Sequence, residues 1–325
     1  MNALVIATTS AATITEAGMV ANLETHASQA RGAYATNTER ALRADIVIFT
    51  GWCDVADRAH LPASPATVAA FIDAMGETKA PATVRRYVSS VSTYHRAAGV
   101  QNPAESMGVK LALKRLHRAK GRAQAQAAPL NRQAVERMLD ATPDTLQGLR
   151  NRAMAAVAYD TLARRSELVA LQADDLEMGA DGAATIIIQR SKTDQEGAGM
   201  VRYLAADTMR HVMAWREAAS LTDGALFRAV GKGGRIGEAL DGAEVSRIFK
   251  IMAKAAGMAA SDVDRISGHS SRVGAAQDMV RHGVELPAVM QAGGWRTPEM
   301  VGRYTARLDA RRSGAAKLAV LQNRA

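Results

Sequence analysis

Residues 267–304 read SGHSSRVGAAQDMVRHGVELPAVMQAGGWRTPEMVGRY, and this stretch decides the fold that we expect. A Gly-His pair stands directly before serine, a common helix cap, which predicts a helix start at His269 with Arg272 in the first turn. A donor and a cation beside the free N–H groups of a helix N-terminus are suited to bind an anion. Taken alone, the same residues fit a capped helix with a surface arginine equally well.

The end of the stretch predicts a further helix that carries a tyrosine. Pro287 and the pair Gly293-Gly294 bound one helix, and Thr297-Pro298 is a typical start for the next. Tyr304 then lies about two turns from that start, on a short helix that can be aimed at a bound group. Taken singly, Trp295 fits a core residue and Tyr304 fits an ordinary half-buried tyrosine.

Two motifs upstream carry further polar groups. Arg164 and Glu167 stand three residues apart on a helix expected over Arg150–Leu171, and a surface ion pair is the simpler reading of this pair alone. The β-branched run Ala184–Gln189 predicts a strand, and the residues VRYL at 201–204 a returning strand. Lys192 therefore lies in the turn of a small hairpin.

Together, these motifs closely resemble the tyrosine recombinases, also called the phage integrase family. The runs GHSSRVGAAQDM and MQAGGW occur in the order typical of the Cre branch of that family. YDTLARRSEL at 159–168 resembles the family's box with its first arginine, and IIIQRSKT at 186–193 resembles its strand and turn with a lysine. The resemblance covers residues 130–325 well and the N-terminal half weakly.

The resemblance implies a role for each matching position. Tyr304 would be the nucleophile, Lys192 the general acid for the leaving hydroxyl, and Glu167 a supporting residue. Arg164 and Arg272 would hold the scissile phosphate, and His269 and Trp295 would complete the pocket. The implied function is site-specific recombination of duplex DNA through a 3′-phosphotyrosine, in a homotetramer on two inverted-repeat sites. The implied setting is the bacterial cytoplasm, with a phage or plasmid context.

The residue types suit this chemistry. Displacing a phosphodiester oxygen builds negative charge on the phosphoryl group. Arginine suits this charge because it stays protonated and can bind two oxygens of one phosphate at once. A covalent tyrosine intermediate keeps the bond energy, so no ATP is needed. The sequence shows no carboxylate cluster suited to Mg²⁺ and no Walker-type glycine loop. We therefore expect no metal and no cofactor.

Composition is consistent with an anionic partner. The chain has 325 residues, with 41 Lys and Arg against 32 Asp and Glu, for a net charge of +9. Charge alone does not choose between nucleic acid and an anionic membrane surface. The sequence has no run of 18 apolar residues, so we expect no transmembrane helix of ordinary type. Cys53 is the only cysteine, which excludes an intrachain disulfide and fits a reducing compartment.

The expected fold is mainly α, a two-domain clamp around duplex DNA, with a small antiparallel β-sheet in the second domain. The divisions that we expect are a flexible tail over 1–20, a helical DNA-binding domain over 21–120, a linker over 121–129 and a catalytic domain over 130–325. Residues 106–135 contain seven Lys or Arg and no Asp or Glu, which favours a phosphate-facing helix and linker over a merely solvated face.

The helix expected over Pro81–Ala98 has an apolar stripe and an opposite polar face, which we predict to read the major groove. A face that merely meets solvent is the alternative. The helix Gly242–Ala256 is a second reading candidate, and the basic loop at 231–235 is expected to meet phosphates. The expected DNA-contacting residues are Arg85, Arg86, Ser89, Ser90, Thr93, Lys114, Arg118, Lys120, Arg122, Lys232, Arg235, Arg247 and Lys250.

The last residues, Ser313–Ala325, form an apolar tail with no evident place in their own domain. In the resembled family such a tail docks on a neighbouring protomer, and packing within the same chain is the alternative. Two rival functions remain open at this point. One is a type IB topoisomerase-like or telomere-resolving enzyme with the same chemistry, and the other is a non-catalytic DNA-binding relative.

Overall fold

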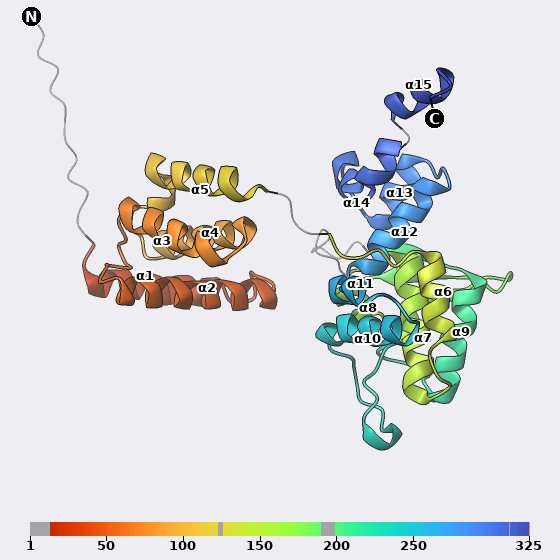
Figure 1. Cartoon of the computed structure of the whole chain (residues 1–325). Coiled ribbons are helices and arrows are strands. Elements are labelled where there is room, and N and C mark those ends of the chain that lie inside the picture. The colour runs from red at the N-terminus through yellow and green to blue at the C-terminus, as the bar shows by residue number, and fades with distance from the viewer. Residues whose placement is uncertain (1–13, 123–125, 190–198, 312, 325) are drawn as a thin grey trace, which may run out of the picture. The chain divides into compact units, whose positions relative to one another are not determined.

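The computed structural model describes residues 14–122, 126–189, 199–311 and 313–324. The chain divides into two compact units, Met1–Ala125 and Gln126–Ala325, hereafter unit 1 and unit 2 (Figure 1). Unit 1 is helical, and unit 2 is helical with one small antiparallel sheet. The predicted fold class is thereby confirmed. The division falls inside the linker expected over residues 121–129.

The described residues of unit 1 form five helices. They are α1 (Glu16–Gln29), α2 (Thr36–Val55), α3 (Pro65–Thr78), α4 (Pro81–Ala97) and α5 (Met107–Lys120), with a 3₁₀ turn at Pro103–Glu105. Helices α2 to α5 share one apolar core. Helix α3 starts where the sequence predicts, because Ser64 accepts the Thr67 N–H at 3.1 Å and Pro65 fits the first helical position. The core packs Phe49 edge-on against Phe71, with ring centroids 5.0 Å apart.

Helix α1 corrects the expected N-terminal tail. It begins at Glu16, inside the segment 1–20, so that expectation is wrong for residues 16–20. The Thr15 hydroxyl accepts the Gly18 N–H at 3.2 Å and caps the helix, and Met19 is buried. Asn22 then donates to the Ala98 carbonyl at 3.1 Å, which ties α1 to the end of α4. Residues 1–13 lie outside the described residues.

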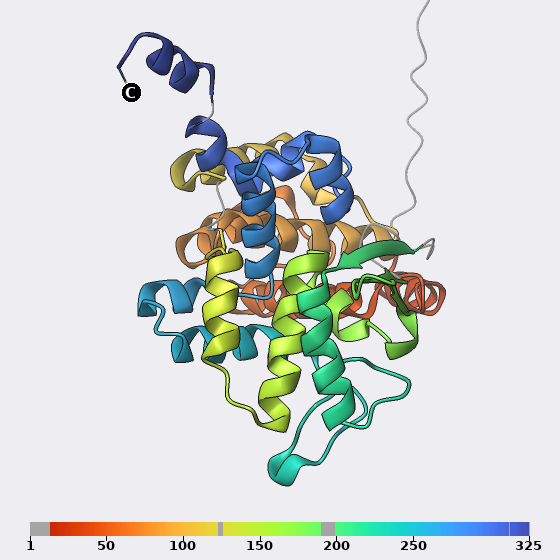
Figure 2. The same ribbon diagram turned by 90° about the vertical axis from the view of Figure 1, so that its right-hand side faces the viewer.

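Unit 2 contains the remaining elements, and Figure 2 shows α6, α7 and α9 side by side. Its helices are α6 (Arg132–Asp140), α7 (Leu146–Thr161), α8 (Arg165–Ala170), α9 (Ala206–Ala218), α10 (Gly242–Ala255), α11 (Ala260–Arg265), α12 (Ser270–Arg281), α13 (Leu286–Gly293), α14 (Pro298–Arg311) and α15 (Gly314–Leu321). Short 3₁₀ turns lie at Ala173–Asp175 and Lys232–Gly234, and the strands are β1 (Leu176–Met178), β2 (Ala184–Ile188) and β3 (Met200–Leu204).

The sheet has one strand more than the predicted hairpin. β2 pairs antiparallel with β3, as expected, and also with β1, which is only three residues long. Ala184, Ile186 and Ile188 alternate into the main core of unit 2, because successive side chains of a strand point to opposite faces. β1 shows no such run of β-branched residues, so the sequence carries little signal for it.

The single helix expected over Arg150–Leu171 is wrong. Helix α7 ends at Thr161, and Leu162 adopts a left-handed conformation with φ 51° before α8 begins at Arg165. A left-handed leucine is costly, so surrounding contacts must hold it. The Leu162 side chain is fully buried in a second core, which it forms with residues of α12, α13 and α14. Its carbonyl accepts a hydrogen bond from Arg272. This break places Arg164 at a helix start.

No helix in the described ranges has both the length and the apolar character needed to span a membrane.

Candidate active site

Helix α12 starts where the sequence predicts, and it presents two of the candidate residues. His269 occupies the cap position, one residue before the serine expected to cap the helix, and Ser270 is the first helical residue. The Ser270 hydroxyl accepts the Ser267 N–H at 3.0 Å and closes the turn. Gly268 is required there, because a Cβ at that position would lie 2.9 Å from the Cβ of Arg165. The α8 and α12 starts therefore meet closely.

Arg272 is a buried cation held by carbonyl oxygens. Its side chain is 2% exposed, and it donates to the carbonyls of Leu162 and Gly293, each at 2.5 Å. The guanidinium also stacks on the Trp295 ring, 4.5 Å from the centroid. It forms no ion pair with a carboxylate of the described residues. Burial and the neighbouring Arg164 lower the pKa of Arg272 to about 10, so it remains protonated at neutral pH.

Arg164 enters the same site from the start of α8. Its guanidinium pairs with Glu167 at 2.5 Å, and its backbone N–H donates to the other Glu167 oxygen at 2.8 Å. Glu167 is 4% exposed and so is a buried carboxylate rather than part of a surface pair. A residue at the third helical position that reaches back to the cap fixes the helix start. Glu167 therefore fixes both the backbone and the guanidinium of Arg164.

His269 lies beside these cations. Partial burial of the ring, together with Arg272, Arg164 and Arg165, lowers the pKa of His269 below its usual value, while Glu167 opposes the shift. The imidazole is therefore neutral at pH 7 and has one nitrogen free to accept a proton. A neutral base close to two arginines is suited to proton transfer in a cationic site.

Trp295 and Tyr304 complete the cluster. The two rings lie 5.3 Å apart between centroids with an interplanar angle of 37°. Trp295 is buried, yet its indole Nε1 has no hydrogen-bond partner in the described structure. An unpaired buried donor is costly, and such a group beside arginines is suited to an anionic ligand. Gly294 ends α13 with φ 60°, and α14 then starts at Pro298, as the sequence predicts.

The structure thus brings together the residues expected at Arg164, Glu167, His269, Arg272, Trp295 and Tyr304. Lys192 lies outside the described residues. Within the described ranges, no group of three or more His, Cys, Asp or Glu side chains is arranged to hold a metal ion.

Sequence reasoning missed the groups that support this cluster. The carbonyls of Leu162 and Gly293 hold Arg272, and a sequence carries no direct signal for a carbonyl that points inward. Arg202 on β3 is buried and donates to the Gln291 carbonyl at 2.8 Å, which fixes the end of α13 just before Trp295. The only signal for Arg202 was that it shares its face of the strand with Leu204, which lies in the core.

The expected reading face of α4 is partly corrected. Arg85, Arg86 and Ser89 are exposed and Thr93 is partly exposed, whereas Ser90 is buried and donates to Asp45 of α2 at 2.8 Å. The placement of Ser90 on the exposed face is therefore wrong. The helical repeat places Ser90 between the apolar stripe and the polar face. Its hydrogen bond to the buried Asp45 then orients the hydroxyl toward the interior of the unit. Arg86 also pairs with Asp45, at 3.0 Å.

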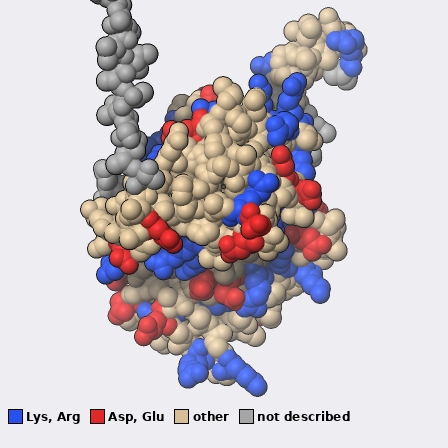
Figure 3. Space-filling model, turned by 90° about the vertical axis from the view of Figure 1, so that its left-hand side faces the viewer, with Lys and Arg blue, Asp and Glu red and all other residues tan. Residues whose placement is uncertain are grey.

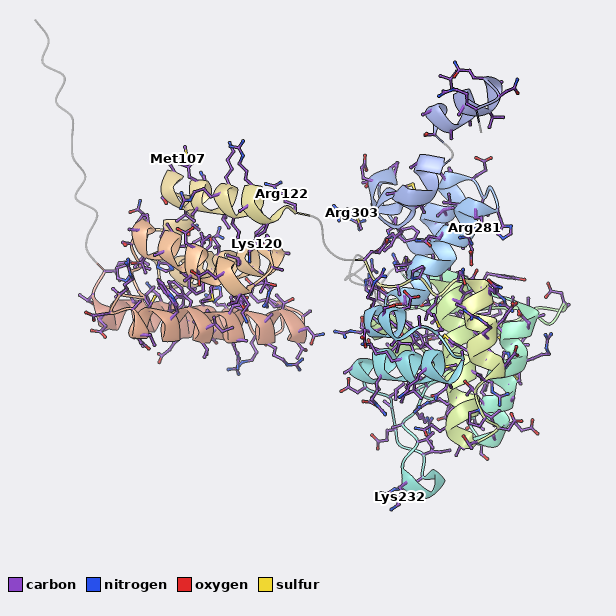
Figure 4. All side chains as sticks on the ribbon, in the orientation of Figure 1. Met107, Lys120, Arg122, Lys232, Arg281 and Arg303 are labelled. Atoms are coloured by element: carbon purple, nitrogen blue, oxygen red, sulfur yellow. The ribbon has the colours of Figure 1, made fainter. Side chains whose placement is uncertain are left out.

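The other expected DNA contacts lie on the surface of their own units. In unit 1, Lys114, Arg118, Lys120 and Arg122 are all exposed. In unit 2, Lys232 and Arg235 are exposed. Lys232 lies at the lower end of Figure 4, and Figure 3 also shows Lys and Arg side chains at the lower end of the molecule. Arg247 is exposed and forms an ion pair with Glu244, and Lys250 donates to the Asp264 carbonyl at 3.0 Å.

Comparison with known proteins places this cluster in a family. The profile of the phage integrase family matches residues 129–311, more than half of the chain. The recombinase Cre of Escherichia phage P1 is 29% identical over 307 residues, which cover 89% of each chain. An integrase/recombinase XerD homolog of Selenomonas ruminantium is 29% identical over 282 residues, which cover 83% of this chain and 81% of the relative.

Solved structures share the fold. A lambda integrase dimer bound to a COC′ core site superposes with a TM-score of 0.61 at 15% identity, covering 89% of this chain and 94% of the other. The Tn1549 transposon integrase in complex with a circular intermediate DNA gives a TM-score of 0.60 at 14% identity, covering 90% and 99%. The resemblance carried by the motifs and the expected enzyme class, a recombinase, are confirmed. With its arginines, histidine, tryptophan and tyrosine gathered in the matched region, the chain belongs to the phage integrase family of tyrosine recombinases.

Proposed function

We propose that this protein cleaves and rejoins duplex DNA at specific sites through a covalent 3′-phosphotyrosine at Tyr304. The observation that carries the proposal is the cluster in unit 2, where the buried Arg272 stacks on Trp295 and Trp295 lies beside Tyr304. The charged Arg272 guanidinium and the Trp295 N–H are two donors that lack an anionic partner among the described residues. A phosphodiester supplies the missing acceptor oxygens.

The reaction follows from the roles of these groups. The Tyr304 oxygen attacks the phosphorus, the bond to the 5′-oxygen breaks, and the 3′ end becomes linked to the tyrosine. Neutral His269 is suited to take the phenol proton, and Lys192 is suited to give a proton to the leaving 5′-oxygen. Arg164 and Arg272 balance the charge that builds on the phosphoryl oxygens. Rejoining is the reverse, with a 5′-hydroxyl as the attacking group.

The duplex for the test comes from selection of bound sequences from random DNA. Two arms in inverted orientation around a short spacer are expected, because each arm would bind one protomer. An enriched sequence without this symmetry would count against the proposed pairing of protomers on a site.

Tyr304→Phe is the direct test of the proposal. The variant loses one oxygen and keeps the ring, so folding and DNA binding are expected to persist. The labelled duplex is incubated with protein, the mixture is denatured with SDS, and DNA-linked protein is counted. Wild type should form the adduct and the variant none, because no other group supplies the phenolic oxygen. An undiminished adduct in the variant would overturn the assignment of Tyr304.

We propose further that the protein acts as a homotetramer on two sites, held by α15. Within its own chain α15 has no buried residue, and it exposes Leu318, Val320 and Leu321. A cavity of about 440 Å³ opens between the ends of α12, α13 and α14, lined by Val284, Leu286 and Val301 among others. The exposed apolar side chains of α15 and the apolar part of the cavity lining would be buried together if α15 of one protomer docked in the cavity of its neighbour.

Deleting residues 313–325 tests this assembly. Binding of one site should survive, because the deleted segment adds no buried residue to unit 2. Gel-shift experiments should show one- and two-protomer complexes but few complexes that join two sites. Recombination at the wild-type rate by the truncated protein would rule out the role of α15. Val284→Asp in the cavity is the matched variant and should give the same defect.

A further inference from the structure

Two glutamine side chains hold the backbone of Tyr304. Gln277 on α12 donates from Nε2 to the Tyr304 carbonyl at 2.9 Å. Gln126 donates from Nε2 to the carbonyls of Arg303 and Tyr304, at 3.2 and 3.3 Å. Helix α14 continues to Arg311, so these carbonyls lie inside the helix and not at its frayed end. A carbonyl oxygen has two lone pairs, so it can accept a side-chain bond besides the helical one.

Gln277 links the tyrosine to the helix that carries Arg272. The two residues are five positions apart on α12, about 7.5 Å along the helix axis at 1.5 Å per residue. Arg272 is itself fixed by two carbonyls, and α12 and α14 pack directly against each other. The Gln277 bond therefore sets the backbone of Tyr304 relative to the same rigid helix that positions the arginine.

Gln126 links the tyrosine to the chain that enters unit 2. Gln126 is the first residue of unit 2. The residues that follow it are hydrogen-bonded to α11 and to the start of α12. The Ala128 N–H donates to Arg265 at 3.1 Å, and the Leu130 N–H donates to Ser270 at 3.0 Å. A Cβ at Gly274 would lie only 1.9 Å from the Leu130 carbonyl oxygen, so the segment presses directly on α12. The first side chain of this segment thus reaches the helix of Tyr304.

We propose that Gln277 and Gln126 are positioning residues, which fix the backbone of Tyr304 for attack on the phosphate and make its placement depend on the chain entering unit 2. This inference rests on the proposed role of Tyr304 as nucleophile. The Trp295 ring restricts the tyrosine side chain, and the two amides restrict the backbone from which that side chain extends. Small misplacements of a reacting group lower its rate without a change in ligand binding.

The test uses the full chain and the selected duplex, nicked so that cleavage cannot be reversed. Gln277→Met, Gln126→Met and the double variant remove the donors and keep a side chain of similar length. Gln133→Met is the control, because Gln133 is exposed on α6 and its side chain forms no hydrogen bond among the described residues. Adduct formation is measured in a single turnover at saturating DNA, and the Kd for DNA is measured separately.

The expected loss is about twofold to tenfold in cleavage rate for Gln277→Met, the range that one hydrogen bond supports. Gln126→Met should lose less, since its bonds are longer and exposed, and the double variant should lose more than either. The Kd and the melting temperature should match those of Gln133→Met. Gln277→Lys, which can still donate to the carbonyl, should keep most of the wild-type rate.

Wild-type cleavage by the double variant would overturn the inference. So would an equal loss by Gln277→Lys and Gln277→Met, or a loss that appears in the Kd and not in the rate. Absence of any adduct from the wild-type chain would instead refute the proposed function. The two failures are therefore distinguishable in one set of reactions.

Discussion

Arg272 in unit 2 and Arg86 in unit 1 have opposite environments. Arg272 is buried, touches carbonyls and a tryptophan ring, and meets no carboxylate among the described residues. The side chain of Arg86 is 49% exposed and pairs with Asp45, a carboxylate that is itself buried. Burial of a cation without a counterion is costly unless a ligand supplies the charge. The contrast supports the proposed anion-binding role of Arg272, whereas Arg86 already has a carboxylate partner within its own unit.

Exposed cations, unlike the buried Arg272, are expected to act on DNA affinity, and the largest expected effect is the salt dependence of that affinity. The net charge of +9 and the exposed cations of α5 and the following residues favour binding through phosphates. With about 6–10 phosphates neutralised, affinity should fall about 10³–10⁵-fold between 50 and 200 mM salt. The slope is measured by fluorescence anisotropy. It should become shallower in Lys114→Gln with Arg118→Gln, and a nearly flat wild-type response would contradict the proposal.

The second effect concerns cleavage. Arg272→Gln should lower the rate of adduct formation about 10²–10³-fold, the cost typical for loss of one preorganised donor to a developing oxyanion. The DNA affinity should change far less, because many exposed cations share it. Single-turnover cleavage and anisotropy separate the two quantities, with thermal melting as the folding control. A variant that cleaves normally would show that Arg272 is a structural arginine like Arg86.

The third effect concerns stability in unit 1. Arg86→Met leaves the Asp45 carboxylate buried without its cation, which should destabilise α4 by about 1–3 kcal/mol. Hydrogen exchange at the α4 amides reports this locally. Asp45→Asn combined with Arg86→Met should recover part of the loss, since the uncompensated charge is gone. Equal protection in wild type and Arg86→Met would show that the pair contributes nothing.

The smallest effect is a pH dependence in the same unit. His95 is fully buried, its Nε2 accepts the Ala63 N–H at 2.9 Å, and its Nδ1 bonds the Val91 carbonyl at 2.8 Å. These partners require the neutral ring, and burial lowers the pKa of His95. The pKa of His95 is lower in the folded than in the unfolded state. Its contribution to the free energy of unfolding is therefore fully present above about pH 6.5. At lower pH this contribution decreases by up to about 1.4 kcal/mol per pH unit.

Hydrogen exchange of α4 between pH 5 and 7 measures this slope, and His95→Gln is the comparison. The variant has no group that titrates in that range at this position, so the wild type should show the steeper fall in stability. Identical slopes in the two proteins would assign the pH dependence to other histidines.

Much of the fold followed from local patterns in the sequence. The apolar stripe of α4, the Ser64-Pro65 start of α3 and the β-branched run of β2 each predict an element that the structure contains. The motifs around His269, Arg272, Trp295 and Tyr304 predict a common site because they match one family in order. The helix break at Leu162 was missed, since leucine normally favours helix and nothing adjacent signals a stop.

By itself the sequence determined the elements whose causes are local, namely periodicity, caps, turn residues and the kinds of side chain available for chemistry. Tertiary structure alone decided how those side chains are held. The left-handed Leu162, the burial of Ser90 on Asp45, and the amides of Gln277 and Gln126 on Tyr304 all depend on partners 27 to 178 residues away. Such contacts form only when the core closes, because burial makes an unpaired polar group too costly to leave without a partner.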